Sequence, residues 1–261
     1  MRGAKMGNGL KLHLGLFYAF LYIPILVLMV LSFNRAGLPT VWTGFSFEWY
    51  GKLLESKAIL SAARNTLIVA VVSTVLATII GTLLAVGVET RRQSAALDAI
   101  LFAPMIIPDI VLAIALLSFY SALSVTLGLH SIILSHVVFN IAFVVAVVRT
   151  RMRNFDHSIL EASADLGASE FTTFRRVLLP AILPGVIAGA LLSFTLSIDE
   201  FIIAFFTAGP GTSSTTLPMQ IYAMIRFGVT PEINAMATIV MFVSFALVFF
   251  AQRADREVFT R

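Results

Sequence analysis

The chain has 261 residues, of which 59% are hydrophobic, 12% are charged and none is cysteine. Soluble globular domains average roughly 45–50% apolar and about 25% charged residues, so this composition excludes an ordinary soluble enzyme. A mean hydropathy of +0.95 also excludes a disordered or nucleic-acid-binding chain, although the pI is near 9.7. The lack of cysteine excludes a disulfide framework and thiolate metal sites.

Long apolar runs predict an all-α integral membrane protein with six transmembrane helices. A helix needs about 20 apolar residues to cross a bilayer, and runs of that length recur along the chain. In chain order we expect helices over residues 12–33, 65–88, 97–121, 129–149, 181–207 and 233–252. The first follows Arg2, Lys5 and Lys11. Its apolar run is too long for a cleavable signal peptide, so we interpret it as a retained anchor.

The positive charges predict which side each loop faces. Lys and Arg collect in cytoplasmic loops, and most of them fall on one side when both termini are cytoplasmic. The external loop over residues 34–64 then carries Arg35, Lys52, Lys57 and Arg64, and Arg226 is external as well. The cytoplasmic residues are Arg2, Lys5, Lys11, Arg91, Arg92, Arg149, Arg151, Arg153, Arg175, Arg176, Arg253, Arg256 and Arg261. The loop between helices 4 and 5, residues 150–180, is cytoplasmic in this orientation.

The 150–180 loop is long enough to form two short helices. Ser158 and Glu161 have the spacing of a capping box, and Gly167 suits a stop that requires positive φ. Ser169 suits the N-cap of a second helix, and Pro180 is expected to end that helix before the next span.

Phe171, Phe174, Val177 and Leu178 give the second short helix an apolar face. The loop either packs under the membrane or provides a docking surface for a partner. The apolar face favours docking, because such a face in the cytosol is normally covered.

The same loop resembles a motif of the permeases of ABC importers. Glu161-Ala162-Ser163, Gly167, Val177, Leu179 and Pro180 follow the spacing of the EAA loop, E-A-A-x(3)-G-x(9)-I-x-L-P. The resemblance implies the type I importer permease fold, with a coupling helix between helices 4 and 5 that sits in a groove of a separate ATPase. The coupling residues that it implies are Glu161, Ala162, Ser163, Gly167, Ala168, Ser169, Phe171, Phe174 and Pro180.

A wider resemblance points to the spermidine/putrescine permeases, of the C-type subunit. It rests on residues 44–50, 108–111, 160–171, 192–201 and 228–238, although Asp199-Glu200 stands where two aspartates are common. The resemblance implies a bacterial inner-membrane importer with a second permease in a heterodimer, an ATPase dimer and an external binding protein. ATP and Mg would bind the ATPase and no cofactor this chain, which has no G-x-x-x-x-G-K-[ST] loop.

This interpretation divides the chain into three parts. Residues 1–61 form the first transmembrane helix and the external loop. Residues 62–252 form the permease domain, which contains the 150–180 coupling loop. Residues 253–261 form a cytoplasmic tail.

Three acids lie within the predicted spans. Asp109 follows Pro104 and Pro108 in the third helix, and Asp199 and Glu200 lie in the outer half of the fifth. A carboxylate at mid-bilayer costs on the order of 2.5–3.5 kcal/mol, so it normally faces a cavity or a partner. Neighbouring helical residues point about 100° apart. One of Asp199 and Glu200 is therefore expected to line a pathway while the other pairs elsewhere, and the sequence leaves open which does which.

Aromatic rings in the external loop would suit a polyamine, which presents ammonium groups separated by methylene runs. Trp42, Trp49 and Tyr50 are the candidates for cation–π contacts, while an interfacial aromatic belt explains Trp49 and Tyr50 equally well. His136 and Asn140, one turn apart, favour interhelical hydrogen bonds over a pore lining.

Other transporter classes explain less of the sequence. A type I permease for another small solute is the main alternative. A secondary transporter or channel would explain the acids but not the EAA-like loop, and an intramembrane enzyme lacks a motif such as H-E-x-x-H.

Overall fold

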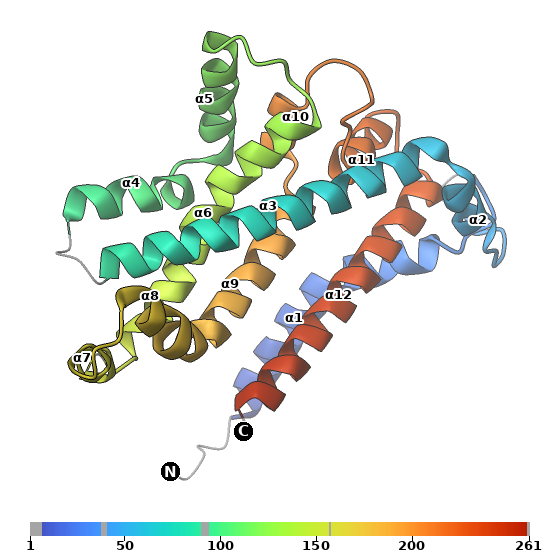
Figure 1. The fold of residues 1–261 in the computed structure, drawn as a ribbon. Helices are drawn as coiled ribbons and strands as arrows, with labels where there is room; N and C mark the ends of the chain where they lie inside the picture. Colours follow the sequence, from blue (N-terminus) through green and yellow to red (C-terminus); the bar gives the residue numbers. More distant parts are fainter. Residues whose placement is uncertain (1–6, 38–40, 90–93, 157, 260–261) are drawn as a thin grey trace. The chain divides into compact units, whose positions relative to one another are not determined.

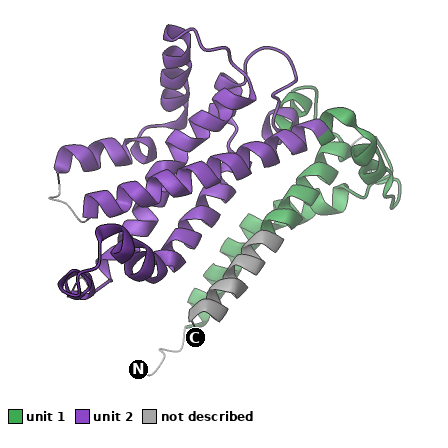
Figure 2. Ribbon diagram, in the orientation of Figure 1, with its two compact units in different colours: residues 1–60, 221–247 green, residues 61–220, 248–261 purple. Residues whose placement is uncertain are grey.

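The computed structural model describes residues 7–37, 41–89, 94–156 and 158–259, with side chains up to residue 245. The chain divides into two compact units (Figure 2), one of residues 1–60 and 221–247 and the other of residues 61–220 and 248–261. Several cations used to predict the orientation, Arg2, Lys5, Arg91, Arg92 and Arg261, lie outside the described residues.

The first unit contains α1 (Asn8–Leu31), α2 (Glu48–Glu55) and the larger part of α12 (Pro231–Phe259) (Figure 1). Helix α1 is apolar on all sides, and none of its side chains is buried. A helix with this pattern is expected to be surrounded by lipid or by other helices rather than by water. The expected first span is therefore present as a helix whose side chains are exposed or half-buried.

The segment between α1 and α2 folds around one buried asparagine. The Asn34 side-chain oxygen accepts the amides of Ala36 at 3.3 Å and Thr43 at 3.1 Å, and its Nδ2 donates to the Val41 carbonyl at 2.8 Å. The Asn34 backbone also pairs with Phe45 in an isolated antiparallel bridge. These bonds satisfy polar backbone groups on the described parts of the turn, residues 34–37 and 41–45.

The core of the second unit lies where α3 (Lys57–Glu89), α6 (Leu129–Arg153) and α9 (Leu179–Asp199) meet. Glycines allow close approach: a Cβ at Gly81 would lie 2.8 Å from the Val144 Cβ, and one at Gly185 would lie 2.7 Å from the Arg151 Cβ. Gly189 also faces Val144, at 3.5 Å. Small residues at helix interfaces are typical of membrane bundles, and here they place α6 between its two neighbours.

The spans match the predicted six only in part. Among the described residues, four helices are long and apolar enough to cross a bilayer: α1, α3, α6 and the helix running over Glu170–Asp199. A fifth requires α4 (Ala95–Ile106) and α5 (Asp109–Ala122) to be counted together. The sixth predicted run forms α12, whose described apolar part, Pro231–Phe245, is shorter.

The expected third span is not one straight helix. Helices α4 and α5 meet at an angle of 108° across Ile107 and Pro108. Ile107 is extended, with ψ of 133°, as is usual before a proline, whose ring disfavours helical geometry in the preceding residue. The proline that was expected to lie within a span therefore breaks it, and α5 begins at Asp109.

The expected fifth span, 181–207, is also interrupted. Helix α9 ends at Asp199, Glu200 is extended with ψ of 114°, and a short helix α10 (Ile202–Thr207) follows. The Glu200 side chain accepts the amide of Ile203 at 2.5 Å, so it stabilises the start of α10 in place of a continuous helix.

The coupling loop forms α7 (Ser158–Asp165) and α8 (Glu170–Thr173), but the prediction that Pro180 ends the second helix is wrong. The helix continues through a π-helical turn, η1 (Phe174–Leu178), into α9. At its end the Leu179 amide donates to the Phe174 carbonyl, five residues back. This wider turn accommodates a proline, which lacks an amide hydrogen and clashes with a normal α-helical turn.

Candidate functional site

The two helix breaks of the second unit bring acidic side chains together. Asp109 is the first residue of α5, and Glu200 precedes α10. Helices α5 and α10 pack through Ala113 and Ile203, which share a buried cluster with Phe139 of α6. Asp109 lies four residues before Ala113 and Glu200 three residues before Ile203, so both acids lie within about one turn of the contact between α5 and α10. Acids that are far apart in the sequence thus lie near the same helix contact.

Asp199 and Glu200 differ in their surroundings. Glu200 is half-buried and engaged with the Ile203 amide, whereas Asp199 is exposed at the end of α9. No Lys or Arg forms an ion pair with Asp109, Asp199 or Glu200 among the residues that the structure describes. Interrupted membrane helices commonly hold polar ligand sites, and uncompensated carboxylates at such a break attract a cation.

The predicted aromatic residues lie in the first unit, where two of them have bonds of their own. The Trp49 Nε1 donates to the Asn34 carbonyl at 2.9 Å, and the Tyr50 and Ser32 hydroxyls are 2.7 Å apart. The Lys52 ammonium stands over the Trp49 ring, 4.2 Å from its centre. Trp49 can therefore hold an alkylammonium group on its face, although a lysine of the same helix occupies it here.

Lys52 also pairs with Glu48 at 2.8 Å. This ammonium holds the pKa of the Glu48 carboxyl below its ordinary value. Trp42 is half-exposed in the loop before α2, and its place in a substrate pathway stays a prediction.

The turn after α7 has the geometry of a Schellman motif. The Gly167 amide donates to the Ala164 carbonyl at 2.8 Å and the Ala168 amide to the Ser163 carbonyl at 3.1 Å, while Gly167 has φ of 79°. The prediction of a positive φ at Gly167 is confirmed. A Cβ there would meet nothing within 4 Å, so the conformation rather than a lack of space calls for glycine.

Hydroxyl groups connect and cap the two short helices. Ser163 and Thr173 are 2.8 Å apart, and Ser169 accepts the Thr172 amide at 3.3 Å, which confirms Ser169 as an N-cap. The capping box between Ser158 and Glu161 does not form: α7 begins at Ser158 itself, whose amide donates to the Asp156 carboxylate at 3.0 Å. Asp156 takes the capping role because it lies in the turn before the helix.

The remaining coupling candidates are mostly accessible. Glu161, Ala162 and Pro180 are exposed, Ala168 and Phe174 are half-buried, and Phe171 is 70% exposed. Leu166 is 88% exposed but falls at a variable position of the motif, so sequence reasoning missed it. Exposed apolar side chains on a folded turn are the usual mark of a docking surface.

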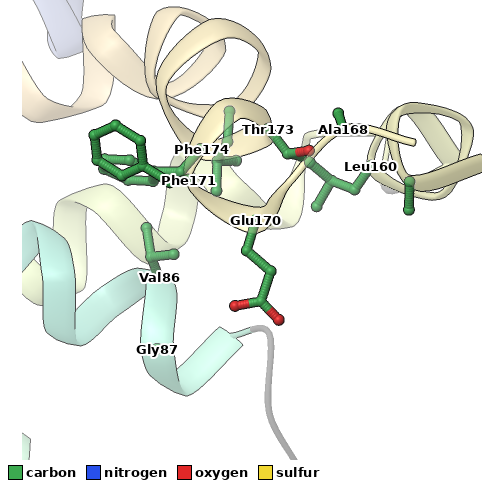
Figure 3. Close-up of a pocket in the computed structure, with 10 residues that line it drawn as sticks. Val86, Gly87, Leu160, Ala168, Glu170, Phe171, Thr173 and Phe174 are labelled. Carbon is green, nitrogen blue, oxygen red and sulfur yellow. The ribbon is translucent and has the colours of Figure 1, made fainter. Parts of the chain in front are cut away.

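A pocket of about 680 Å³ lies between this loop and the end of α3 (Figure 3). Phe171 and Phe174 contribute apolar walls, and Val86 and Gly87 of α3 close the other side. The Glu170 side chain points away from the two rings, toward the end of α3 (Figure 3). Leu160 and Phe174 also pack against the buried core of α3, α6 and α9, so they hold the coupling loop on the bundle.

An ionic cluster that sequence reasoning missed joins three helices. The buried Arg149 of α6 contacts Glu89 of α3 at 3.0 Å and Asp98 of α4 at 2.6 Å. The positive-inside pattern treated Arg149 only as a topology signal. Val145 and Met152 lie four residues before and three residues after Arg149 and share its face of α6, and these apolar neighbours were the available sign that Arg149 faces the bundle.

Comparison with known proteins identifies the family. Residues 77–256 match the family of binding-protein-dependent transport system inner membrane components. The chain belongs to this family.

Two similar proteins are also permeases of transport systems. The chain is 43% identical over 242 residues to the spermidine/putrescine transport system permease protein PotC of Escherichia coli (strain K12), covering 92% of this chain and 91% of the relative. It is 40% identical over 254 residues to the putrescine transport system permease protein PotI of the same strain, covering 92% and 89%.

Solved structures share the fold. A bacterial ABC transporter that imports the acidic polysaccharide alginate matches with a TM-score of 0.78 at 19% identity, over 96% of this chain and 94% of that one. The MetNI methionine ABC transporter matches with a TM-score of 0.64 at 21% identity, over 76% and 95%. The prediction of a type I importer permease fold is confirmed, and the chain is a multi-pass inner-membrane transport subunit rather than an enzyme.

Proposed function

We propose that this chain is a permease subunit of an ATP-driven importer of polyamines, with Asp109, Asp199 and Glu200 in the substrate pathway. The single observation that carries the proposal is the placement of Asp109 and Glu200 at two helix breaks, each within about one turn of the α5–α10 contact, without a compensating Lys or Arg among the described residues. A polyamine is a flexible chain of ammonium groups, and closely placed carboxylates attract such a cation. The names of PotC and PotI support the same substrate class.

The neighbouring acids Asp199 and Glu200 are proposed to have different roles, because their hydrogen bonds and exposure differ. Glu200 caps α10, so it fixes the shape of the break as well as its charge. Asp199 is exposed and free of ion pairs with described residues, so it is the better placed of the two to bind an ammonium group. Trp42, Trp49 and Tyr50 are proposed to contribute aromatic faces on the external side.

We further propose that the importer contains an ATPase dimer, a second permease and an external binding protein. The coupling loop supports this, because Leu166 and Phe171 are exposed apolar residues on an ordered turn. In this assembly both termini of the chain are cytoplasmic, and the loop seats in the ATPase. ATP-driven movement of the ATPases would then switch the pathway between its two sides.

The test of the substrate site is uptake of labelled putrescine and spermidine by the reconstituted importer, normalised to assembled complex. Asp109→Asn and Asp199→Asn keep the shape of the side chain but remove a charge, so the KM should rise, more for the more highly charged spermidine. Glu55→Gln, an exposed carboxylate at the end of α2, is the matched control and should behave as the parent protein. Unchanged uptake by both Asn variants would remove these acids from the pathway.

A further inference from the structure

A buried hydrogen-bonded chain holds the last turn of α9, just before the acidic break. The His136 Nδ1 of α6 lies 2.7 Å from the Ser197 hydroxyl of α9, which lies 3.1 Å from the Ser73 hydroxyl of α3. All three side chains are buried, and Ser197 precedes Asp199 by two residues. The expected interhelical bonding of His136 is thereby confirmed, while the buried Asn140 amide has no hydrogen-bond partner among the described residues.

The direction of this chain can be worked out from its ends. In one direction His136 donates from Nδ1 to Ser197 and Ser197 donates to Ser73. The Ser73 hydroxyl can then donate to the Ala70 carbonyl, 3.4 Å away. The alternative direction would place the proton on His136 Nε2, which is buried without a partner. An orphaned buried N–H is rarer and costlier than an orphaned lone pair, so the Nδ1–H tautomer is favoured.

We infer that His136 is a positioning residue for the polyamine site: it donates through Ser197 to hold the end of α9 and thereby sets the place of Asp199. The inference rests on the proposed function, because it concerns how the proposed acids are placed. Fixing a ligand group within a fraction of an ångström requires support from a second layer of bonded side chains. Among the described residues no C-cap hydrogen bond ends α9, because Glu200 is already extended.

Three substitutions at His136 separate this bond from mere packing. His136→Asn places an amide nitrogen near the position of Nδ1 and should keep the bond to Ser197. His136→Gln places its amide near Nε2, where the described residues offer no partner. His136→Phe fills the space without any donor. Thr195→Val is the matched control on α9, because the Thr195 hydroxyl bonds within its own helix, to the Leu191 carbonyl.

The readout is the KM and the maximal rate of uptake of putrescine and spermidine by the assembled importer. We expect His136→Phe, His136→Gln and Ser197→Ala each to raise the KM about three- to tenfold, the size of one lost neutral hydrogen bond. The maximal rate per complex should stay within about twofold, and His136→Asn should restore the KM. Reduced assembly with an unchanged KM in the complexes that form would show a purely structural role and overturn the inference.

A double-variant experiment separates this inference from the proposed function. If His136 acts through the position of Asp199, the effect of His136→Phe on KM should largely vanish in an Asp199→Asn background. Full additivity of the two effects would refute the positioning role. If Asp109→Asn and Asp199→Asn themselves leave KM unchanged, the proposed acid site fails instead. Solid-state ¹⁵N spectra of the complex, compared with His136→Asn, should show Nδ1 protonated, and an Nε2–H signal would contradict the bond direction.

Discussion

Replacing Arg149 by methionine tests whether the ionic cluster holds α3, α4 and α6 together. The Arg149 side chain is 3% exposed, and its partners Glu89 and Asp98 are 9% and 33% exposed. Methionine has a similar length and is apolar, so the change removes the charge while filling most of the space. The buried Glu89 is then left with only the exposed Arg153, at 4.0 Å, and the partly exposed Asp98 has no cation among the described residues.

The expected loss of stability is large because the charged partners of Arg149, Glu89 and Asp98, remain in the protein. Removing one member of a buried ion pair costs about 3–5 kcal/mol, and the partial exposure of Asp98 lowers the estimate here to about 3 kcal/mol. The measurement is the free energy of unfolding of the chain in mixed micelles, obtained by titration with SDS. Arg153→Met is the matched control. Arg153 is 64% exposed and 4.0 Å from Glu89, so its loss should cost less than about 0.5 kcal/mol.

A compensated variant distinguishes unpaired charge from lost packing. Combining Arg149→Met with Glu89→Gln and Asp98→Asn removes all three charges, and the stability should recover by more than half, because buried ion pairs contribute little relative to neutral replacements. An Arg149→Met protein as stable as the Arg153→Met control would refute the reasoning. A triple variant no more stable than Arg149→Met would show that the guanidinium acts through its shape and its ring contact with Phe102.

The two remaining predictions concern glycines. Gly167→Val should destabilise the turn by about 1–3 kcal/mol because of the positive φ, and less ATPase should co-purify with this variant. Gly167→Asn should retain ATPase binding, because asparagine tolerates this conformation. Equal recovery of ATPase with both variants would contradict the argument. Gly81→Ala should lower the thermal midpoint of the purified chain because its Cβ would meet Val144 at 2.8 Å, whereas Gly87→Ala on the same helix meets nothing within 4 Å and should not.

The sequence predicted what depends on local pattern. Apolar runs located the helices, and residue preferences at turns located Gly167 and Ser169 correctly. Gly185 and Gly189, four residues apart on α9, form a small-residue pattern that is visible in the sequence, and both face α6. Each of these signals lies within a few residues of the structure that it specifies.

The features that the sequence did not predict depend on competition between local signals. Pro108 breaks a predicted span although Pro24 lies inside α1 and Pro184 inside α9 without ending either helix. Helix α9 ends before Glu200, whose carboxylate accepts a hydrogen bond from the Ile203 amide, and composition does not reveal this bond. The Arg149 cluster and the His136 chain join residues about 50 or more positions apart, and such pairings are not visible without the fold.

One continuous helix connects the two candidate sites. It runs over Glu170–Asp199, so it begins in the coupling loop, ends at the acidic break and spans about 45 Å at 1.5 Å per residue. The π-helical turn and Pro180 lie near its coupling end, while Gly185 and Gly189 press its middle against α6 and Ser197 fixes its far end. We infer that movement of the coupling loop reaches Asp199 through this helix, with α6 as its support. The test is the distance between spin labels at the two ends of this helix in the assembled importer. A change in that distance when ATP binds the importer would contradict a rigid connection and would indicate bending within the helix, for which the π-helical turn is the first candidate.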